Sequence, residues 1–249
     1  MTRIIPLLKG VPITGSDGAL GWSSVTLIQN EDEIILVDTG FHGNRHHLLQ
    51  ALKDNRIEPD EVNRVILTHL HFDHCLNYDL FTKASFVLSR AEYEYVKDKK
   101  YLEVGDVFIP DILERIENRG LVVFYNELKI SQDIRCLLTP GHTPGSSSVV
   151  VDLPNGDRTG ICGDLFKYAW EINLLPEVPQ GTFGDIRELK TSQKMILDMG
   201  VKKLICGHDR PLSFQDKNIV FDETGDCEIT LFIDTNSSIA TNYKIKLAK

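Results

Sequence analysis

The sequence lacks any apolar run close to the ~20 residues that a membrane-spanning helix requires. Its first residues also lack the long apolar core and the small-residue cleavage site of a signal peptide. Cysteine is scarce, and the five that occur are odd in number and scattered, which argues against a disulfide framework. We therefore expect a cytoplasmic protein that is kept reduced and does not associate with a membrane.

An excess of positive charge is also missing. Lysine and arginine number 27 against 36 aspartates and glutamates, so the formal net charge is −9. Long-range repulsion slows the encounter of such a chain with a polyanion, which disfavours nucleic acid as a partner without excluding it. With 249 residues, 42% of them hydrophobic and 25% charged, the composition is that of an ordinary globular protein with a sizeable core.

One short stretch, residues 65–74, carries most of the chemical information. Val65 to Thr68 has the apolar and β-branched character of a short buried strand, and three histidines and one aspartate follow within six residues. If the segment stays extended, alternation places His69, His71 and Asp73 on one face, whereas His74 joins them only if a helix begins there. A polar strand end with chance histidines is the alternative, but ligand spacing this dense is typical of metal sites.

The same pattern, an acid or a histidine beside glycine at the end of a strand, recurs four more times. Active sites are commonly built on loops at strand ends. The residues at these four ends are Asp38, His142, Asp164 and His208.

Periodicity and turn residues predict alternating strands and helices along the chain. Strands are expected at residues 4–9, 23–29, 33–37, 65–68, 84–88, within 121–138, and at 146–152, 158–162 and 203–206. Helices are expected at residues 43–55, 90–100, 111–118 and 186–199. The polar tail has strand-like pieces at 228–233 and 239–247, which suit an extra hairpin or an arm that forms a homodimer.

Several other residues have two interpretations. The histidines His42, His46 and His47 are expected to be exposed on a helix, and Cys75, Cys162 and Cys206 to be buried thiols rather than metal ligands. Aromatic residues next to the strand ends either line a substrate site or pack in the core. These aromatic residues are Phe72, Phe166, Tyr168 and Trp170.

Five separated motifs resemble the metallo-β-lactamase superfamily. They are VDTG with Asp38, THLHFDH with His69 to His74, TPGHTPG with His142, CGDLF with Asp164, and CGHD with His208, in the family's order over roughly residues 20–210. The resemblance implies an α/β fold, a four-layer αββα sandwich of two mixed sheets with metals at one sheet edge. We expect residues 1–249 to form a single such domain with a short β-rich extension from about residue 215.

The resemblance also implies ligands for two divalent metal ions. His69, His71 and His142 resemble the first metal site, Asp73, His74 and His208 the second, and Asp164 the carboxylate that bridges them. Asp38 would support the ligand loops from outside, or would only form the turn at its strand end. Zinc is the first expectation for a set of imidazoles and carboxylates, with iron or manganese as alternatives.

An aspartate at the bridging position resembles the hydrolase branches of the family, which include glyoxalase II, acyl-homoserine lactonases and nucleases. The stretches DLF-x₃-SFVLSR, SSSVVV and GHDRPLSF resemble the glyoxalase-II-like group of metallo-β-lactamase domain-containing protein 1, to which RNA cleavage has been assigned. The chain lacks the C-terminal helical domain through which glyoxalase II contacts glutathione. Where lactonases carry a tyrosine after the bridging aspartate, this chain has Lys167 and Tyr168 without a clean match in register, and we expect these two residues to contact substrate.

These observations predict a metal-dependent hydrolase. We expect a hydroxide shared by the two metals to attack a small ester, thioester or lactone, with Asp73 orienting it and carrying its proton. The alternative within enzymes is a phosphodiesterase or endoribonuclease. A flavodiiron protein would need a glutamate ligand and a flavin domain, and a scaffold with a decayed site would not retain all seven ligands.

Overall fold

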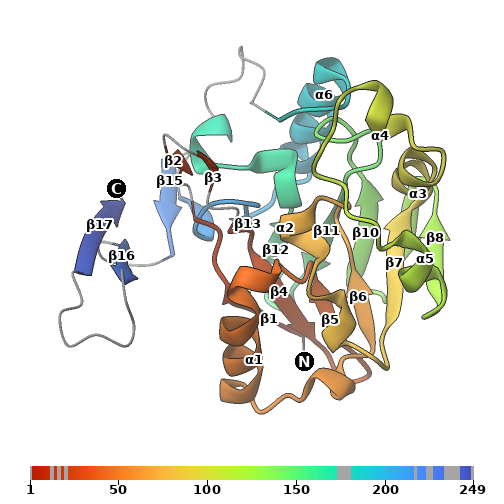
Figure 1. Ribbon diagram of the computed structural model, residues 1–249. Coiled ribbons are helices and arrows are strands. Elements are labelled where there is room, and N and C mark those ends of the chain that lie inside the picture. The colour runs from red at the N-terminus through yellow and green to blue at the C-terminus, as the bar shows by residue number, and fades with distance from the viewer. Residues whose placement is uncertain are drawn as a thin grey trace.

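Two mixed β-sheets form the framework of the protein (Figure 1). The computed structural model describes residues 2–11, 14–15, 18–19, 22–172, 181–215, 218–222, 227–232 and 242–247. The first sheet contains, in spatial order, β1 (Arg3–Leu8), β4 (Val25–Gln29), β5 (Ile34–Val37), β6 (Arg64–Ile66), β7 (Ser85–Ser89) and β8 (Leu121–Phe124). The second contains β15 (Asn218–Phe221), β14 (Leu212–Gln215), β13 (Lys203–Ile205), β12 (Arg158–Ile161), β11 (Ser147–Asp152), β10 (Ile134–Leu138) and β9 (Glu127–Lys129).

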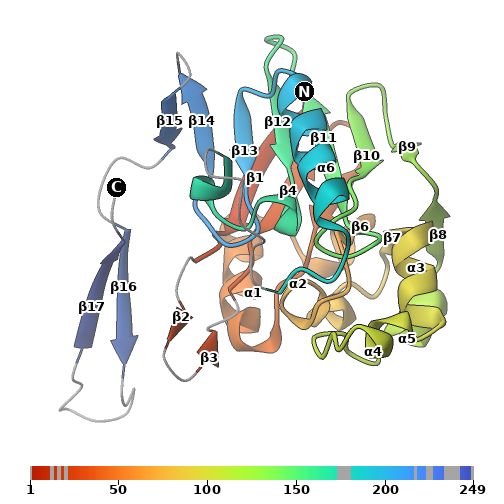
Figure 2. The same cartoon turned by 90° about the horizontal axis from the view of Figure 1, so that it is seen from above.

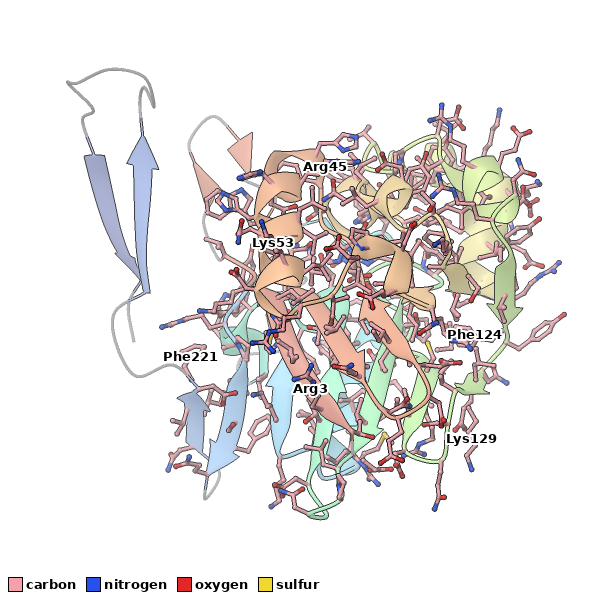
Figure 3. The ribbon with its side chains drawn as sticks, turned by 90° about the horizontal axis from the view of Figure 1, so that it is seen from below. Arg3, Arg45, Lys53, Phe124, Lys129 and Phe221 are labelled. Atoms are coloured by element: carbon pink, nitrogen blue, oxygen red, sulfur yellow. The ribbon has the colours of Figure 1, made fainter. Side chains whose placement is uncertain are left out.

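Helices cover the outer face of each sheet (Figures 1 and 2). The first sheet packs against α1 (Arg45–Asp54), α3 (Arg90–Lys97) and α5 (Leu113–Glu117), and the second against α6 (Ile186–Asp198). Figure 3 marks the two ends of α1 by Arg45 and Lys53, and the Arg45 guanidinium donates to both carboxylate oxygens of Asp79 at 2.6 and 2.9 Å. The remaining helices are short: α2 (Phe72–Cys75), α4 (Lys100–Glu103) and the 3₁₀ turns His42–Asn44, Pro59–Glu61, Tyr78–Leu80, Gly163–Phe166 and Ala169–Ile172.

The core consists of three apolar layers. Strand β5 shows why: Ile35 and Val37 pack between the sheets, whereas Leu36 faces the helices and contacts the layer that includes Leu48 of α1. Strands buried on both faces must be apolar throughout, which explains the continuous run from Ile34 to Val37. This sheet-on-sheet packing with helices outside confirms the predicted four-layer αββα architecture.

Strand direction places the ligand-bearing loops at one edge of the sandwich. In the first sheet β5, β6, β7 and β8 run parallel, so the segments that follow β5 and β6 leave from the same edge. In the second sheet β10 and β12 are both antiparallel to β11, and β13 is parallel to β12, so the loops after β10, β12 and β13 also share one edge. The carboxyl ends of parallel strands are where α/β proteins build their binding sites.

The predicted helix from residue 90 to residue 100 is present but ends three residues early. Helix α3 ends at Lys97, and Lys99 adopts a left-handed backbone conformation with φ of 56° before the separate turn α4 begins. Strands β14 and β15 were not predicted, and they extend the second sheet to Phe221.

Two short hairpins stand outside the large sheets. Strands β2 (Thr14–Gly15) and β3 (Gly18–Ala19) form one. In the tail, β16 (Cys227–Phe232) pairs antiparallel with β17 (Asn242–Leu247), and both views show this pair apart from the sandwich (Figures 1 and 2). The predicted tail strands are thus present, although residues 233 and 239–241 lie outside the described part. Across the described helices, none combines the length and the apolar content that a bilayer span needs.

The layer between the sheets yields a prediction about stability. Ile35 is fully buried there, and its truncation to alanine should leave a cavity and lower the free energy of unfolding by about 2–5 kcal/mol. Val122, which is 37% exposed on β8, should lose less than about 1 kcal/mol when it is truncated in the same way. Urea unfolding of both variants measures the difference, and equal losses would contradict the assignment of the core.

Candidate metal centre

The segment from His69 to His74 changes from extended chain to helix. Strand β6 ends at Ile66, His71 is still extended with φ of −70° and ψ of 146°, and α2 begins at Phe72. His74 therefore joins the cluster through a helical turn, as predicted. The prediction that Asp73 shares an extended face with His69 and His71 is wrong, because Asp73 lies on α2, and the same turn brings both Asp73 and His74 inward.

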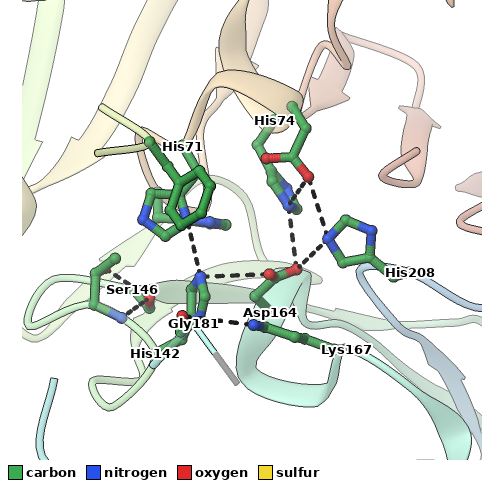
Figure 4. Close-up of polar contacts among 12 residues, drawn as sticks. His71, His74, His142, Ser146, Asp164, Lys167, Gly181 and His208 are labelled. Carbon is green, nitrogen blue, oxygen red and sulfur yellow. Dashed lines mark hydrogen bonds and ion pairs between the residues drawn. The ribbon is translucent and has the colours of Figure 1, made fainter. Parts of the chain in front are cut away.

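All seven predicted ligand residues lie in one cluster (Figure 4). Nitrogen Nε2 of His142 is 3.0 Å from Nδ1 of His71, and Nε2 of His208 is 3.2 Å from Oδ2 of Asp73. Asp164 lies between these pairs. Its Oδ1 is 3.1 Å from His74 Nε2 and 3.3 Å from His208 Nε2, and its Oδ2 is 3.3 Å from His142 Nε2.

The glycine of the His208 loop permits this close approach. A Cβ at Gly207 would lie 2.1 Å from Oδ1 of Asp164, so any larger residue would displace that carboxylate. The Gly207 amide also donates to the carbonyl of Phe166, and the His208 amide donates to the carbonyl of Lys167. The loops after β12 and β13 are thereby fastened together by backbone contacts.

The cluster offers donor atoms that suit divalent cations. Its potential ligand atoms form three groups, and within each group the atoms lie no more than 4.8 Å apart. The groups are His69, His71 and His142; His69, His74 and Asp164; and Asp73, His74 and His208. In the described part of the chain, His69 Nε2 is buried without a hydrogen-bond partner, and His74 Nε2 and Asp164 Oδ1 face each other at 3.1 Å without the geometry of a hydrogen bond. Buried polar atoms without partners are costly, and bound cations would satisfy these three. Imidazole and carboxylate donors fit zinc, iron or manganese.

Asp38 holds one side of the cluster from outside. Its Oδ2 accepts a hydrogen bond from His74 Nδ1 at 2.8 Å, which turns Nε2 of His74 toward the centre. The Thr68 amide and hydroxyl donate to the same carboxylate at 2.8 Å each. Asp38 has a left-handed backbone with φ of 59°, so it both forms the turn after β5 and orients a ligand. Hydrogen bonds of this kind fix the tautomer and the orientation of metal-binding histidines.

Asp106 plays the same part for His71, and the sequence analysis missed it. Its Oδ2 lies 3.0 Å from His71 Nε2 and accepts the Tyr95 hydroxyl at 3.0 Å, while its Oδ1 accepts the Phe108 amide at 3.0 Å. The bond to Nε2 directs Nδ1 of His71 toward His142. The local sequence gives little warning of this role, since an acid beside Gly105 in a segment of uncertain structure is ordinary in a surface loop.

The imidazoles differ in their affinity for protons. Burial lowers the pKa of His69 and of His142 well below the ordinary value, which keeps both rings neutral. Burial also opposes the cation of His74, but the carboxylates of Asp164, Asp73 and Asp38 outweigh it and raise the pKa of His74 well above its usual range. The same balance, led by Asp164, raises the pKa of His208. A metal cation that binds to His74 and His208 must therefore displace the protons that these two imidazoles hold.

Aromatic rings flank the cluster on two sides. Next to His71, the rings of Phe108 and Phe183 lie with their centroids 5.5 and 5.6 Å from the imidazole and 5.8 Å from each other. Next to His208, Tyr168 stacks on Trp170 at 5.8 Å. Phe108 and Phe183 were not predicted, and no sequence signal marked them.

The other residues named as candidates in the sequence lie partly in the core, partly beside the cluster and partly at the surface. Phe166 is fully buried in the core, and Phe72 packs on Phe41 and Phe108. Lys167 Nζ lies 3.5 Å from the Gly181 carbonyl beside the cluster (Figure 4). His42, His46 and His47 are exposed. Four of the five cysteines, Cys75, Cys136, Cys162 and Cys206, are free and buried, and none of them belongs to a group of potential ligands among the described residues.

The contact between Asp106 and His71 gives a testable expectation. Asp106→Asn replaces an obligate acceptor by an amide that also donates, so His71 loses its fixed tautomer, and metal affinity should fall by about 10–100-fold. Competition of the metal-free protein with a zinc chelator measures this affinity. Asp111→Asn, at an exposed position nearby, is the control and should bind as the wild type does. Unchanged affinity in Asp106→Asn would show that this hydrogen bond does not orient His71 for a ligand.

Comparisons with known proteins agree with this geometry. The model of the metallo-beta-lactamase superfamily matches residues 20–208. An N-acyl homoserine lactonase of Bacillus sp. is 27% identical over 210 residues, covering 74% of this chain and 79% of that protein. Metallo-beta-lactamase domain-containing protein 1 of Xenopus laevis is 33% identical over 147 residues, covering 58% of this chain and 54% of the relative.

A solved structure shares the fold. AidC, described as a dizinc quorum-quenching lactonase, has a TM-score of 0.63 and 20% identity, and the match covers 82% of this chain and 79% of AidC. The family match spans most of the chain and contains the complete cluster from His69 to His208. The chain belongs to the metallo-beta-lactamase superfamily.

Proposed function

We propose that this protein is a dinuclear metal-dependent hydrolase that opens lactone rings. The cluster of five imidazoles and two carboxylates carries the proposal, with Asp164 in contact with residues of both halves. Relatives named N-acyl homoserine lactonase, which match 74% of the chain, support a lactone over other esters.

We assign His69, His71 and His142 to one metal ion, Asp73, His74 and His208 to the other, and Asp164 to both. Zinc is our choice of metal, since AidC is described as a dizinc enzyme and the donor set suits zinc. When bound, two such ions would supply Lewis acidity and would lower the pKa of water from 15.7 to about 7.

We assign the proton transfer to Asp73. Its side chain is 11% exposed and that of Asp164 only 4%, so Asp73 is the carboxylate that solvent reaches more easily. In ring opening, the oxygen of a water bonds to the lactone carbonyl carbon and the bond from that carbon to the ring oxygen breaks. Asp73 accepts the proton of the attacking water and returns it to the ring oxygen, which becomes the hydroxyl of the hydroxy acid.

The aromatic rings suit a substrate with an apolar substituent. Phe108 is 38% exposed, although its ring centroid lies 5.5 Å from that of the buried His71. Apolar side chains that remain exposed next to a site mark the binding of an apolar group. We propose that an acyl chain lies against Phe108 and Phe183, and that Lys167 and Tyr168 contact the polar part of the substrate on the opposite side.

The bridging role of Asp164 is tested by removing its carboxylate. Asp164→Ala should bind fewer than two metal ions per chain and lose at least about 100-fold in kcat/KM, because a ligand removed outright costs more than an outer contact. Elemental analysis and lactone hydrolysis are measured on the same preparation. Asp198→Ala removes a surface carboxylate paired with Lys194 and should change neither value. Full activity in metal-depleted Asp164→Ala would rule the mechanism out.

Substrate preference is tested with a panel that contains homoserine lactones of increasing acyl length, a thioester, a β-lactam, a phosphodiester and single-stranded RNA. Lactones should be hydrolysed fastest, and longer acyl chains should lower KM. Phe108→Ala should raise KM for a long-chain lactone about tenfold, since losing part of an apolar contact costs roughly 1–3 kcal/mol, and should leave short-chain lactones unaffected. Tyr125→Ala, at a residue that is 71% exposed on the short connection after β8, is the control.

A phosphodiesterase or endoribonuclease is the second candidate. The relative from Xenopus laevis, at 33% identity over 147 residues, favours it, and the net charge of −9 opposes it. RNA cleavage that is faster than lactone hydrolysis in the panel would replace the first proposal by this one.

Location, assembly and domain boundaries are further proposals. Four free, buried cysteines agree with a reducing compartment such as the cytoplasm. We propose one domain over residues 1–249 with a β-rich extension from about residue 215, and a homodimer in which the β16–β17 hairpin of this extension is the contacting arm. Light scattering of the purified protein tests the dimer.

A further inference from the structure

A buried glutamate on α3 connects the two loops that carry the three-histidine group. Glu92 is fully buried, unlike Glu94, which lies on the same helix and pairs with Arg90 near the surface. Its Oε1 accepts the Leu70 amide at 2.9 Å, and its Oε2 accepts the Thr143 hydroxyl at 2.6 Å. Leu70 stands between His69 and His71, and Thr143 directly follows His142.

The start of α3 is built to receive the His142 loop. Ser89 caps the helix by accepting the Glu92 amide at 3.0 Å, and its hydroxyl donates to the Gly145 carbonyl at 2.5 Å. A Cβ at Gly145 would lie 1.9 Å from the Glu92 nitrogen, so only glycine allows the loop to lie this close to the helix. The position of Glu92 relative to the His142 loop is therefore fixed by backbone packing.

Among the described residues, the Glu92 carboxylate accepts its side-chain hydrogen bonds from the Leu70 amide and the Thr143 hydroxyl. Burial raises the pKa of Glu92, while the bonds from Thr143 and Leu70 act in the opposite direction. Burying a carboxyl group costs free energy unless each oxygen is hydrogen-bonded. A side chain that served only to fill space at this position would be apolar, as its neighbours on the core face of α3, Tyr95 and Val96, are.

We propose that Glu92 is a positioning residue that sets the separation of the His69–His71 segment from the His142 loop, and so fixes the geometry of the three-histidine half of the metal centre. The proposal rests on the metal centre proposed above. In the part of the chain that the structure describes, the two oxygens of Glu92 accept from Leu70 and Thr143, and neither of these belongs to the other half. Its loss should therefore weaken one metal-binding step and spare the other.

The test is a stepwise titration of metal-free protein with Co²⁺, followed by visible absorption, with His142→Ala and His208→Ala used to assign each binding step to one half. Glu92→Leu fills a similar volume with apolar atoms but leaves the Leu70 amide and the Thr143 hydroxyl without their acceptor. It should weaken the three-histidine step by about 10–100-fold, the usual range for an outer contact to a ligand, and change the other step less than about threefold.

Two further variants separate positioning from folding. Glu92→Gln can still accept from the Leu70 amide and donate to Thr143, whose hydroxyl also contacts Ser146 Oγ at 2.8 Å, so it should restore most of the affinity. Thr143→Val removes one of the two contacts with little change of volume and should weaken the same step, which keeps the proposal testable if Glu92→Leu does not fold. Glu94→Leu, on the exposed side of α3, is the matched control.

The outcomes are distinct. A wild-type protein that binds no Co²⁺ overturns the proposed metal centre itself. If the wild type shows two binding steps, and Glu92→Leu and Thr143→Val change neither step or weaken both equally, the positioning role is wrong. The proposed metal centre would remain supported in that case.

Discussion

The burial of five imidazoles and two carboxylates in one place is the constraint on which the rest of this structure depends. Such a concentration of polar groups removes hydration from every one of them, and the cost is recovered only if each atom has a partner. Asp164 shows how tightly the groups are placed, because its two oxygens lie within 3.3 Å of nitrogens from three histidines on three separate segments of the chain. Metal cations bound to these nitrogen and oxygen atoms would give each of them a partner.

The surrounding protein turns this cluster into an ordered centre. The sandwich brings the ends of β6, β10, β12 and β13 to one edge, and buried acids outside the cluster then set the orientation of individual rings. Asp38 orients His74, Asp106 orients His71, and Glu92 joins the loops of His71 and His142. The centre is thus held by hydrogen bonds to Asp38 after β5, to Asp106 and to Glu92 of α3.

The sequence predicted the fold and the site correctly where a local pattern of neighbouring residues is enough to identify a structure. Strands such as residues 34–37 are recognisable because burial on both faces demands apolar residues throughout, and the histidine-rich segment is recognisable because few other structures need its spacing. It was uninformative where the role depends on distant partners. Asp106 and Glu92 look like ordinary surface acids until the fold brings His71 and Thr143 to them, and the break at Lys99 depends on a left-handed residue that propensity does not anticipate.

The proposed chemistry requires that metal ions occupy this cluster. The most direct measurement is anomalous X-ray diffraction from crystals of the zinc-reconstituted protein, recorded on both sides of the zinc absorption edge. Two anomalous peaks per chain are expected, one among His69, His71 and His142 and the other among Asp73, His74 and His208, with Asp164 in contact with both. An anomalous map with no peak inside the cluster, from crystals that do contain zinc, would contradict the proposed metal centre.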